Sequence, residues 1–185
     1  VEYLRFASEE ARRRHDARNG VPIDGGDPRY ERFSARSIAP NTESEIAGGE
    51  TTGWVTEISV SLAEETIAAL SRSDAGLDSV HFVLSVDGRV AIEAPLSLIA
   101  GGSRHGEAVT SVPVTVDAGT VTFRFPVAVV ERYAIGLANN AGSTPVEVTG
   151  ANVTTVADAG VPQRIASGEI GRLYGEYRDV TVSST

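Results

Sequence analysis

Histidine is the side chain best suited to acid–base or metal chemistry near neutral pH, and this chain has three. His15, His81 and His105 fall on a predicted helix, a predicted strand and a glycine-rich loop. A metal site on a jelly roll typically needs two histidines one residue apart on a strand, and that pair is missing. The chain also contains no cysteine, which removes disulfides and thiolate chemistry. The sequence therefore predicts no enzyme activity, no metal and no cofactor.

The sequence also predicts neither a catalytic pair of carboxylates nor a phosphate-binding loop. Glu9-Glu10 and Glu64-Glu65 are adjacent on predicted helices, so their side chains do not face each other as glycosidase carboxylates must. The segment GGSRHG (101–106) does not lie between a strand and a helix start, as a phosphate-binding loop would. One Trp and five Tyr give little support for a flat carbohydrate-binding face.

Two further motifs favour ordinary surface roles. The run Arg12-Arg13-Arg14 could contact nucleic acid or anionic lipid, but the neighbouring acids cancel most of its field. We therefore expect no sequence-specific nucleic-acid binding. Asn152-Val153-Thr154 is a glycosylation sequon that falls inside a predicted strand, where modification is disfavoured.

The charge composition points to the setting in which the chain works. All sixteen basic residues are Arg, against twenty-five acids, and the net charge is −9. A lack of Lys fits either a GC-rich genome or a saline environment, where acidic surfaces stay hydrated. No segment approaches the roughly 20 apolar residues of a membrane span, and the first residues lack the apolar core of a signal peptide.

The first 49 residues are expected to form a helix and an extended arm. Apolar residues recur at helical spacing within residues 1–18, and Asn19-Gly20 would end that helix. Pro22, Gly25, Gly26 and Pro28 then disfavour regular structure. Residues 1–36 carry a net charge of +1, whereas residues 37–185 carry −10, so the two parts meet different surroundings.

Short strands are expected from Gly53 onward. In GWVTEISVSL the apolar side chains of Trp54, Ile58, Val60 and Leu62 are predicted to share one face, and AEETIAALSR predicts a short helix. The strongest local signal is the hairpin VHFVLSVDGRVAIEAPL, which turns at Asp87-Gly88. Further strands are predicted at 108–116, 120–126, 127–135, 145–148, 151–156 and 177–183.

Many short strands without alternating helices predict an all-β fold. We expect a single jelly-roll β-barrel or sandwich of about eight antiparallel strands. Two parts are predicted, a helix and extended arm (1–49) and the barrel with its C-terminal tail strand (50–185).

The predicted appendage cannot be stable alone, because an isolated helix of this length is marginal in water. It must pack on its own barrel or on a neighbouring subunit, and an extended arm commonly does the second. The residues that we expect at such contacts are aromatic, apolar or basic: Tyr3, Leu4, Phe6, Arg12, Arg13, Arg14, Tyr30 and Phe33.

The chain resembles a viral capsid protein in three features. These are the helix and arm ending near GGETTGW, the hairpin VHFVLSVDGRVAIEAPL and the acidic, Lys-free composition. The likeness is greatest to the small major capsid protein, a vertical single β-barrel, of icosahedral internal-membrane viruses of halophilic archaea. That resemblance implies a virion location in a shell built with a larger second major capsid protein. It also implies capsomers that stand over a membrane, towards which the N-terminal segment would lie.

Two other classes of function remain open from the sequence. One is a decoration or fibre domain of a tailed halophilic virus, which would form a homotrimer without a second capsid protein. The other is a ligand-binding β-sandwich of a secreted or surface protein, which would be a monomer with a definable groove.

Overall fold

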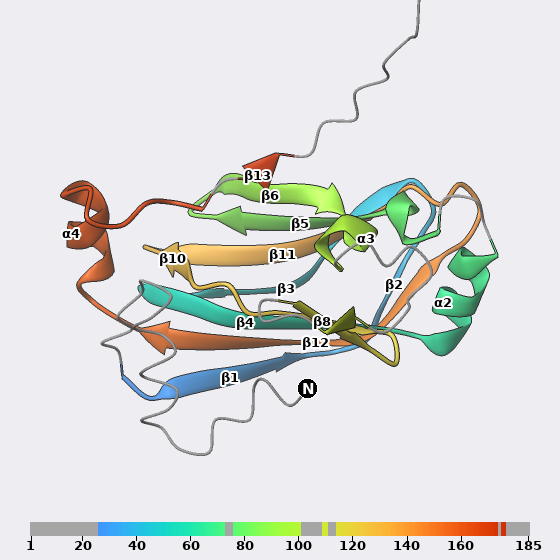
Figure 1. Cartoon of the computed structure of the whole chain (residues 1–185), viewed down its shortest axis with the longest axis horizontal. Coiled ribbons are helices and arrows are strands. Elements are labelled where there is room, and N and C mark those ends of the chain that lie inside the picture. The colour runs from blue at the N-terminus through green and yellow to red at the C-terminus, as the bar shows by residue number, and fades with distance from the viewer. Residues whose placement is uncertain (1–25, 73–75, 101–108, 111–113, 174, 177–185) are drawn as a thin grey trace, which may run out of the picture.

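The computed structural model of the chain describes residues 26–72, 76–100, 109–110, 114–173 and 175–176. These residues form two largely antiparallel β-sheets that pack face to face (Figure 1). The prediction of an all-β sandwich is therefore confirmed. No helix within these ranges is both long and apolar enough to cross a membrane.

The larger sheet, sheet A, contains eight of the described strands in the order β1-β12-β4-β9-β8-β7, while β10 pairs with β4 and β2 pairs with β12. Its strands are β1 (Pro28–Phe33), β2 (Arg36–Ile38), β4 (Gly53–Leu62), β7 (Val109–Thr110), β8 (Val114–Asp117), β9 (Thr120–Phe123), β10 (Val127–Val129) and β12 (Val146–Ala157).

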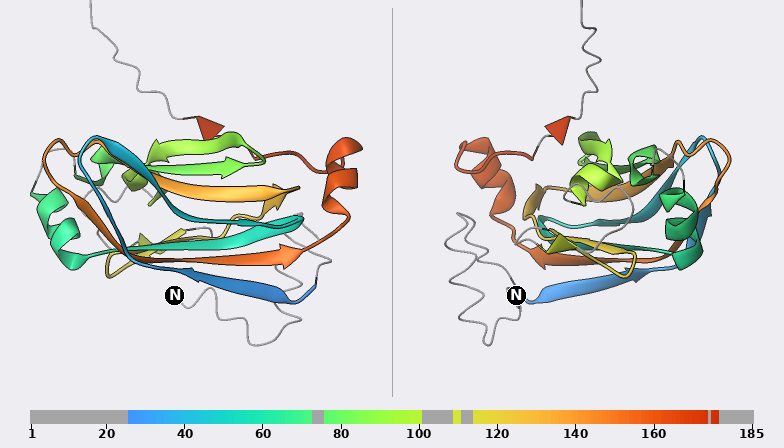
Figure 2. Two further views of the ribbon diagram at one scale, coloured as in Figure 1. Left: turned by 180° about the vertical axis from the view of Figure 1, so that it is seen from behind. Right: turned by 45° about the vertical axis from the view of Figure 1, so that its right-hand side comes forward.

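Sheet B contains five described strands in the order β13-β6-β5-β11-β3. They are β3 (Thr42–Glu50), β5 (Val80–Val86), β6 (Arg89–Pro95), β11 (Arg132–Asn139) and β13 (Gly175–Glu176). The helical elements are α2 (Glu64–Ser71), the 3₁₀ turn η1 (Gly76–Ser79), α3 (Leu96–Ile99) and α4 (Val161–Ala166). Figure 2 shows α2 and α4 at opposite ends of the sandwich.

Alternating apolar side chains from both sheets meet between them and form the main core. Phe82 on β5 and Phe123 on β9 are in contact across the core, with ring centroids 4.8 Å apart. The predicted hairpin is confirmed as β5 and β6, and its turn residues have the required positive φ of 50° at Asp87 and 77° at Gly88. The predicted short helix is α2, and His81 lies on the face of β5 opposite the buried Val80 and Phe82.

The prediction of an extended arm up to residue 49 is wrong from Pro28 onward. β1 pairs with β12 over six residues, and β3 pairs with β11, so both strands belong to the sandwich. These two strands gave little signal because they lie at sheet edges, where backbone pairing holds a strand whose side chains are mostly polar. The sandwich therefore begins about twenty residues before residue 50, where the predicted arm ends.

Several strand boundaries also differ from the predictions. The expected continuous strand at 127–135 is two strands, because β10 pairs with β4 in sheet A while β11 crosses into sheet B. The two strands expected around Gly150 are one strand, β12, with a bulge at this point. The segment 108–116 contains β7 and β8, which pair with each other after a reversal of the chain. The predicted N-terminal helix and the strand at 177–183 lie outside the described residues.

A second bulge, which lies in β4, makes the Trp54 side chain point to the face opposite the predicted one. Thr154 lies opposite Glu57, but Thr155 lies opposite Val55, so Thr56 is the extra residue. Val55 therefore points into the main core, and Trp54 points to the outer face of sheet A. There Trp54 packs with Ala128, Val156 and Val161 of α4, and only 3% of it is exposed.

We predict that Gly53→Ala strongly destabilises the fold. Gly53 has φ +153°, and an added Cβ would lie 2.1 Å from the carbonyl oxygen of Val156. Backbone strain and this overlap should together lower the free energy of unfolding by about 2–5 kcal/mol, as measured by urea denaturation. Gly88→Ala is the matched control, because Gly88 also has positive φ but an added Cβ would meet nothing within 4 Å. Equal losses in the two variants would contradict the argument.

Candidate functional site

The side of the sandwich that presents strands β1 and β3 is the candidate functional site, here called the β1/β3 edge. β1 borders sheet A and β3 borders sheet B, and no other described strand pairs with their outer sides. Unpaired backbone N–H and C=O groups at such an edge can pair with another chain. Near the middle of β3, Arg36 Nη1 donates to the carbonyl oxygen of Glu45 at 2.6 Å, so the open stretch of this strand beside the cleft follows Glu45.

A buried hydrogen bond joins the two sheets beneath this edge. The hydroxyl of Tyr133 on β11 donates to Glu31 Oε2 on β1 at 2.9 Å, and Tyr133 is only 2% exposed. Glu31 Oε1 also pairs with Arg29 Nε at 3.0 Å. Burial and the bond to the Glu31 carboxylate raise the pKa of the Tyr133 phenol well above its usual value near 10. The phenol therefore stays a donor and fixes β1 relative to sheet B.

Two glycines on β3 leave room for this bond and for an open cleft. A Cβ at Gly49 would lie 3.0 Å from Tyr133 Oη and 3.2 Å from Glu31 Oε2, so a side chain there would disturb the contact. The cleft has a volume of about 650 Å³ and is lined by Arg29, Glu31, Arg32, Phe33, Gly48, Gly49 and Glu50. It runs between the two strand edges and holds charges of both signs.

Two of the predicted contact residues lie at this edge, and they differ in exposure. Tyr30 is 73% exposed and is available to a partner. Phe33 is partly buried and packs against the main core, so much of its surface is used by its own fold. The other six, Tyr3, Leu4, Phe6, Arg12, Arg13 and Arg14, lie outside the described residues.

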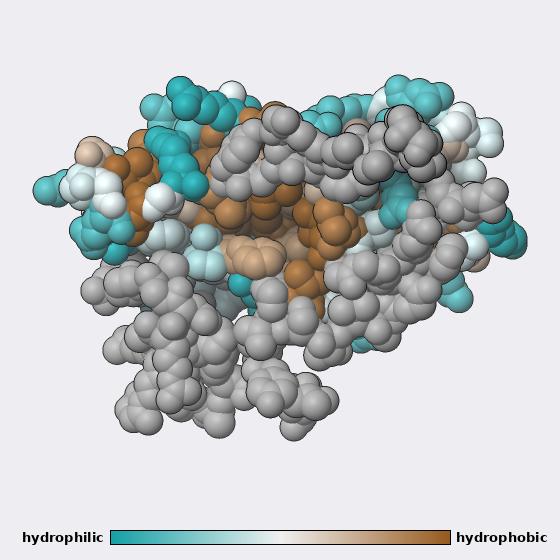
Figure 3. All heavy atoms as spheres, turned by 45° about the horizontal axis from the view of Figure 1, so that its top comes forward, coloured by the Kyte–Doolittle hydropathy of each residue, from teal (hydrophilic) through white to brown (hydrophobic). Residues whose placement is uncertain are grey.

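An apolar hollow of about 320 Å³ lies elsewhere on the molecule. It is lined by Val86, Arg89, Val90, Ala91, Val127, Ala128, Arg172 and Leu173. Figure 3 shows a group of apolar side chains in the middle of the face turned towards the viewer. Val90 and Leu173 are among the large apolar residues that remain exposed. The charged side chains in its lining are Arg89 and Arg172, and Arg172 is already bonded to Asp87.

A single carboxylate organises the turn beside this hollow. The backbone N–H groups of Val130, Glu131 and Arg132 all donate to Asp87, the shortest at 2.8 Å, and Arg172 Nη1 donates to Asp87 Oδ2 at 2.8 Å. Burial by itself would raise the pKa of Asp87, but these donors outweigh it and lower the pKa below its usual value. Asp87 therefore ties the β5–β6 turn to the connection between the sheets.

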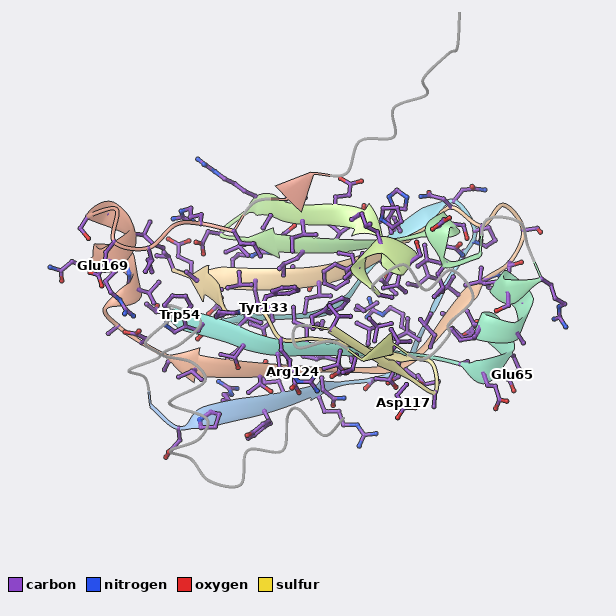
Figure 4. All side chains as sticks on the ribbon, in the orientation of Figure 1. Trp54, Glu65, Asp117, Arg124, Tyr133 and Glu169 are labelled. Atoms are coloured by element: carbon purple, nitrogen blue, oxygen red, sulfur yellow. The ribbon has the colours of Figure 1, made fainter. Side chains whose placement is uncertain are left out.

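The Trp54 side chain anchors α4 at one end of the sandwich, where Figure 4 labels it. Trp54 Nε1 donates to Asp158 Oδ2 at 2.9 Å, and Asp158 also forms an ion pair with Arg164. The Arg164 guanidinium lies 5.5 Å from the Trp54 ring centroid, within the range of a cation–π contact. These contacts bind the helix to the outer face of sheet A and serve the fold.

No group of three His, Asp or Glu in the described part of the chain could hold a metal ion. His105 lies outside it, and His81 is half-buried on the outer face of sheet B. The sequence did not predict the site residues Glu31, Gly49 and Tyr133. Their local sequence pattern carries no signal for a contact between strands a hundred residues apart. Asp87 was predicted only as a turn residue.

No protein-family model matches the chain, and no curated protein matches it. Among solved structures, the VP2 subviral particle of infectious bursal disease virus is similar over 75% of this chain and 35% of that chain, with 7% identity and a TM-score of 0.39. Dimeric latent PorU from Porphyromonas gingivalis is similar over 74% of this chain and 10% of that chain, with 17% identity and a TM-score of 0.25. This chain thus spans about a third of the first protein and a tenth of the second.

We predict that Asp87→Asn destabilises the fold at neutral pH but not at low pH. The lowered pKa means that ionised Asp87 stabilises the folded state above its unfolded pKa near 3.9, and that this contribution is lost as the pH falls. The variant should lose about 2 kcal/mol at pH 7, and the two proteins should converge towards pH 2.5 in urea unfolding. Asp117→Asn, at the exposed end of β8, is the control and should follow wild type. A constant difference at every pH would contradict the prediction.

We predict that Tyr133→Phe weakens the dependence of the unfolding free energy on pH in alkaline solution. Unfolded Tyr133 ionises above about pH 10 while the folded residue stays protonated, so the unfolding free energy falls as the pH rises above 10. The variant should lose about 1 kcal/mol at pH 7 and then show a shallower alkaline decline. Tyr30→Phe, which removes an exposed hydroxyl, is the comparison in the same chemical denaturation series. Parallel alkaline curves for wild type and Tyr133→Phe would overturn this account.

Proposed function

We propose that the sandwich is a single jelly roll. The order β1-β12-β4-β9 in sheet A and β6-β5-β11-β3 in sheet B supports this assignment. Among these eight strands the first lies beside the last, and successive strands change sheet except at the β5–β6 hairpin. Two interlocked four-stranded sheets of this kind are typical of jelly rolls, which occur in viral capsids, lectins and cupins. In this chain β7 and β8 are an addition between β6 and β9.

We further propose that the chain is a structural virion protein, a major capsid protein in the icosahedral shell of a halophilic virus. The observation that carries this proposal is the jelly-roll strand order combined with an open strand edge and an acidic, Lys-free composition. The sandwich would form a rigid wall unit that stands upright in the shell. Copies of this chain would share capsomers with a larger second major capsid protein, and the protein would be located in the virion.

Charge would make this assembly depend on salt. Each copy carries a net charge of −9, so neighbouring copies repel one another in dilute buffer. At 1 M salt the Debye length is about 3 Å, and this long-range repulsion is screened. Residues 1–25, which include Arg12, Arg13 and Arg14, would lie towards anionic headgroups of an internal membrane.

Light scattering in molar salt and after dilution tests the proposal. We expect the full chain to form oligomers or particles in molar salt that dissociate at low salt, and a chain lacking residues 1–25 to lose higher assembly. The cut belongs before Gly26, because removal of residues 1–36 would delete β1 from sheet A. Circular dichroism and thermal unfolding should show that the shortened chain keeps its fold.

Other outcomes identify the alternatives. A salt-independent homotrimer would favour a decoration or fibre domain. A monomer under all conditions, also when mixed with the larger capsid protein, would contradict the capsid proposal and favour a ligand-binding sandwich.

A further inference from the structure

We propose that two copies of this chain associate through the β1/β3 edge, with β1 of one copy beside β3 of the other. The inference rests on the proposed function, because it names the surface through which copies in a shell would meet. It commits to a second copy of the chain as the occupant of the edge.

The edge offers main-chain groups for pairing. β1 provides six residues and β3 provides nine, and in the described part of the chain each pairs with a neighbour on one side only. The carbonyl of Glu45 is already bonded to Arg36, so the accessible stretch is Ile46–Glu50 beside the cleft. This stretch includes Gly48 and Gly49, which line the open cleft beside β1.

The charged side chains on the two strands differ in sign. The side chain of Arg29 is 75% exposed and Arg32 is exposed, so the charge that β1 presents to solvent is positive. Glu31 neutralises part of this charge through its pair with Arg29 at 3.0 Å, but its own side chain is only 20% exposed and is also bonded to Tyr133, so the exposed surface of β1 stays positive at Arg29 and Arg32. β3 presents the exposed carboxylates of Glu43, Glu45 and Glu50.

This separation of charge selects among the possible pairings. Two β1 edges would place Arg beside Arg, and two β3 edges would place Glu beside Glu, and like charges on neighbouring strands are destabilising. Only a β1 edge beside a β3 edge brings opposite charges together. Charges on edge strands commonly prevent unwanted association, and here they would exclude the like pairings while allowing the unlike one.

The position of both edges on one side of the sandwich fixes the symmetry. A single two-fold axis through that side places β1 of each copy beside β3 of the other, so both pairs form in one self-complementary interface. Tyr30, which is 73% exposed on β1, would lie close to this interface and could bury apolar surface there.

The interface is compatible with assembly in high salt. Charges in direct contact across paired strands are a few ångströms apart, whereas the net negative charges of two copies act over tens of ångströms. Salt screens the distant repulsion much more than the contact pairs. Backbone hydrogen bonds between the strands would persist in both conditions.

Cross-linking between single-cysteine variants tests the contact directly, because the natural chain has no cysteine. Arg32→Cys on β1 is mixed in molar salt with ¹⁵N-labelled Glu50→Cys on β3, treated with a short flexible bismaleimide, and analysed by intact mass spectrometry. We expect the mixed product to exceed either product between identical variants by about tenfold. Asp117→Cys on β8 is the control and should give little product with either partner.

A charge swap tests the pairing rule independently. Arg32→Glu alone, or Glu45→Arg with Glu50→Arg in one chain, should each weaken self-association by about tenfold, which corresponds to about 1.4 kcal/mol. Mixing these two proteins should restore dimers, because both β1/β3 contacts of the two-fold pair then join opposite charges. Circular dichroism of each variant should match wild type.

The outcomes separate this inference from the proposed function. Salt-dependent particles without β1/β3 cross-links, or without rescue in the mixture, would overturn the edge pairing and leave the capsid proposal standing. A wild-type chain that stays monomeric at every salt concentration would overturn the edge pairing. The capsid proposal would fall with it only if the chain also fails to assemble with the larger capsid protein.

Discussion

Strand β12 is the element on which the rest of the sandwich depends. Its twelve residues pair with β4 along one side, and with β1 and β2 along the other. The residues that it joins to β1 are more than a hundred positions apart, so the N-terminal strands of sheet A cannot be placed before β12 is in position. The main core, the bulge that turns Trp54 outward and the open β1/β3 edge all follow from this arrangement.

The two sheets are held in register by a few polar contacts as well as by apolar packing. The Tyr133–Glu31 hydrogen bond links β11 to β1 beneath one edge. The Asp87 carboxylate binds the backbone where the chain passes from β10 to β11. Because buried donors and acceptors are costly to leave unpaired, these contacts fix the position of the strand edges more sharply than apolar contacts can. A rigid edge of defined position is what a repeating assembly needs.

The strongest candidate surface is therefore made of backbone and charge rather than of catalytic side chains. β1 presents Arg29 and Arg32, and β3 presents three carboxylates at the same side of the sandwich. The capsid proposal and the edge-pairing proposal both draw on this open edge, but each has its own experiment. Together they describe how an acidic chain could join copies of itself when salt screens their repulsion.

The sequence by itself determined the features that depend on local periodicity. Alternation identified β4, β5 and β6, and Asp87-Gly88 identified the hairpin turn, because side-chain direction and turn dihedral angles are set within a few residues. The polar segments 28–33 and 42–50 show no comparable alternation. They form β1 and β3 only because they pair with strands that are distant in the sequence. The tertiary structure also decided that Trp54 faces α4, and that Asn139 is fully buried with its side-chain amide bonded to the carbonyl of Ile38. Bulges and contacts across a hundred residues arise from the global packing, so no local pattern encodes them.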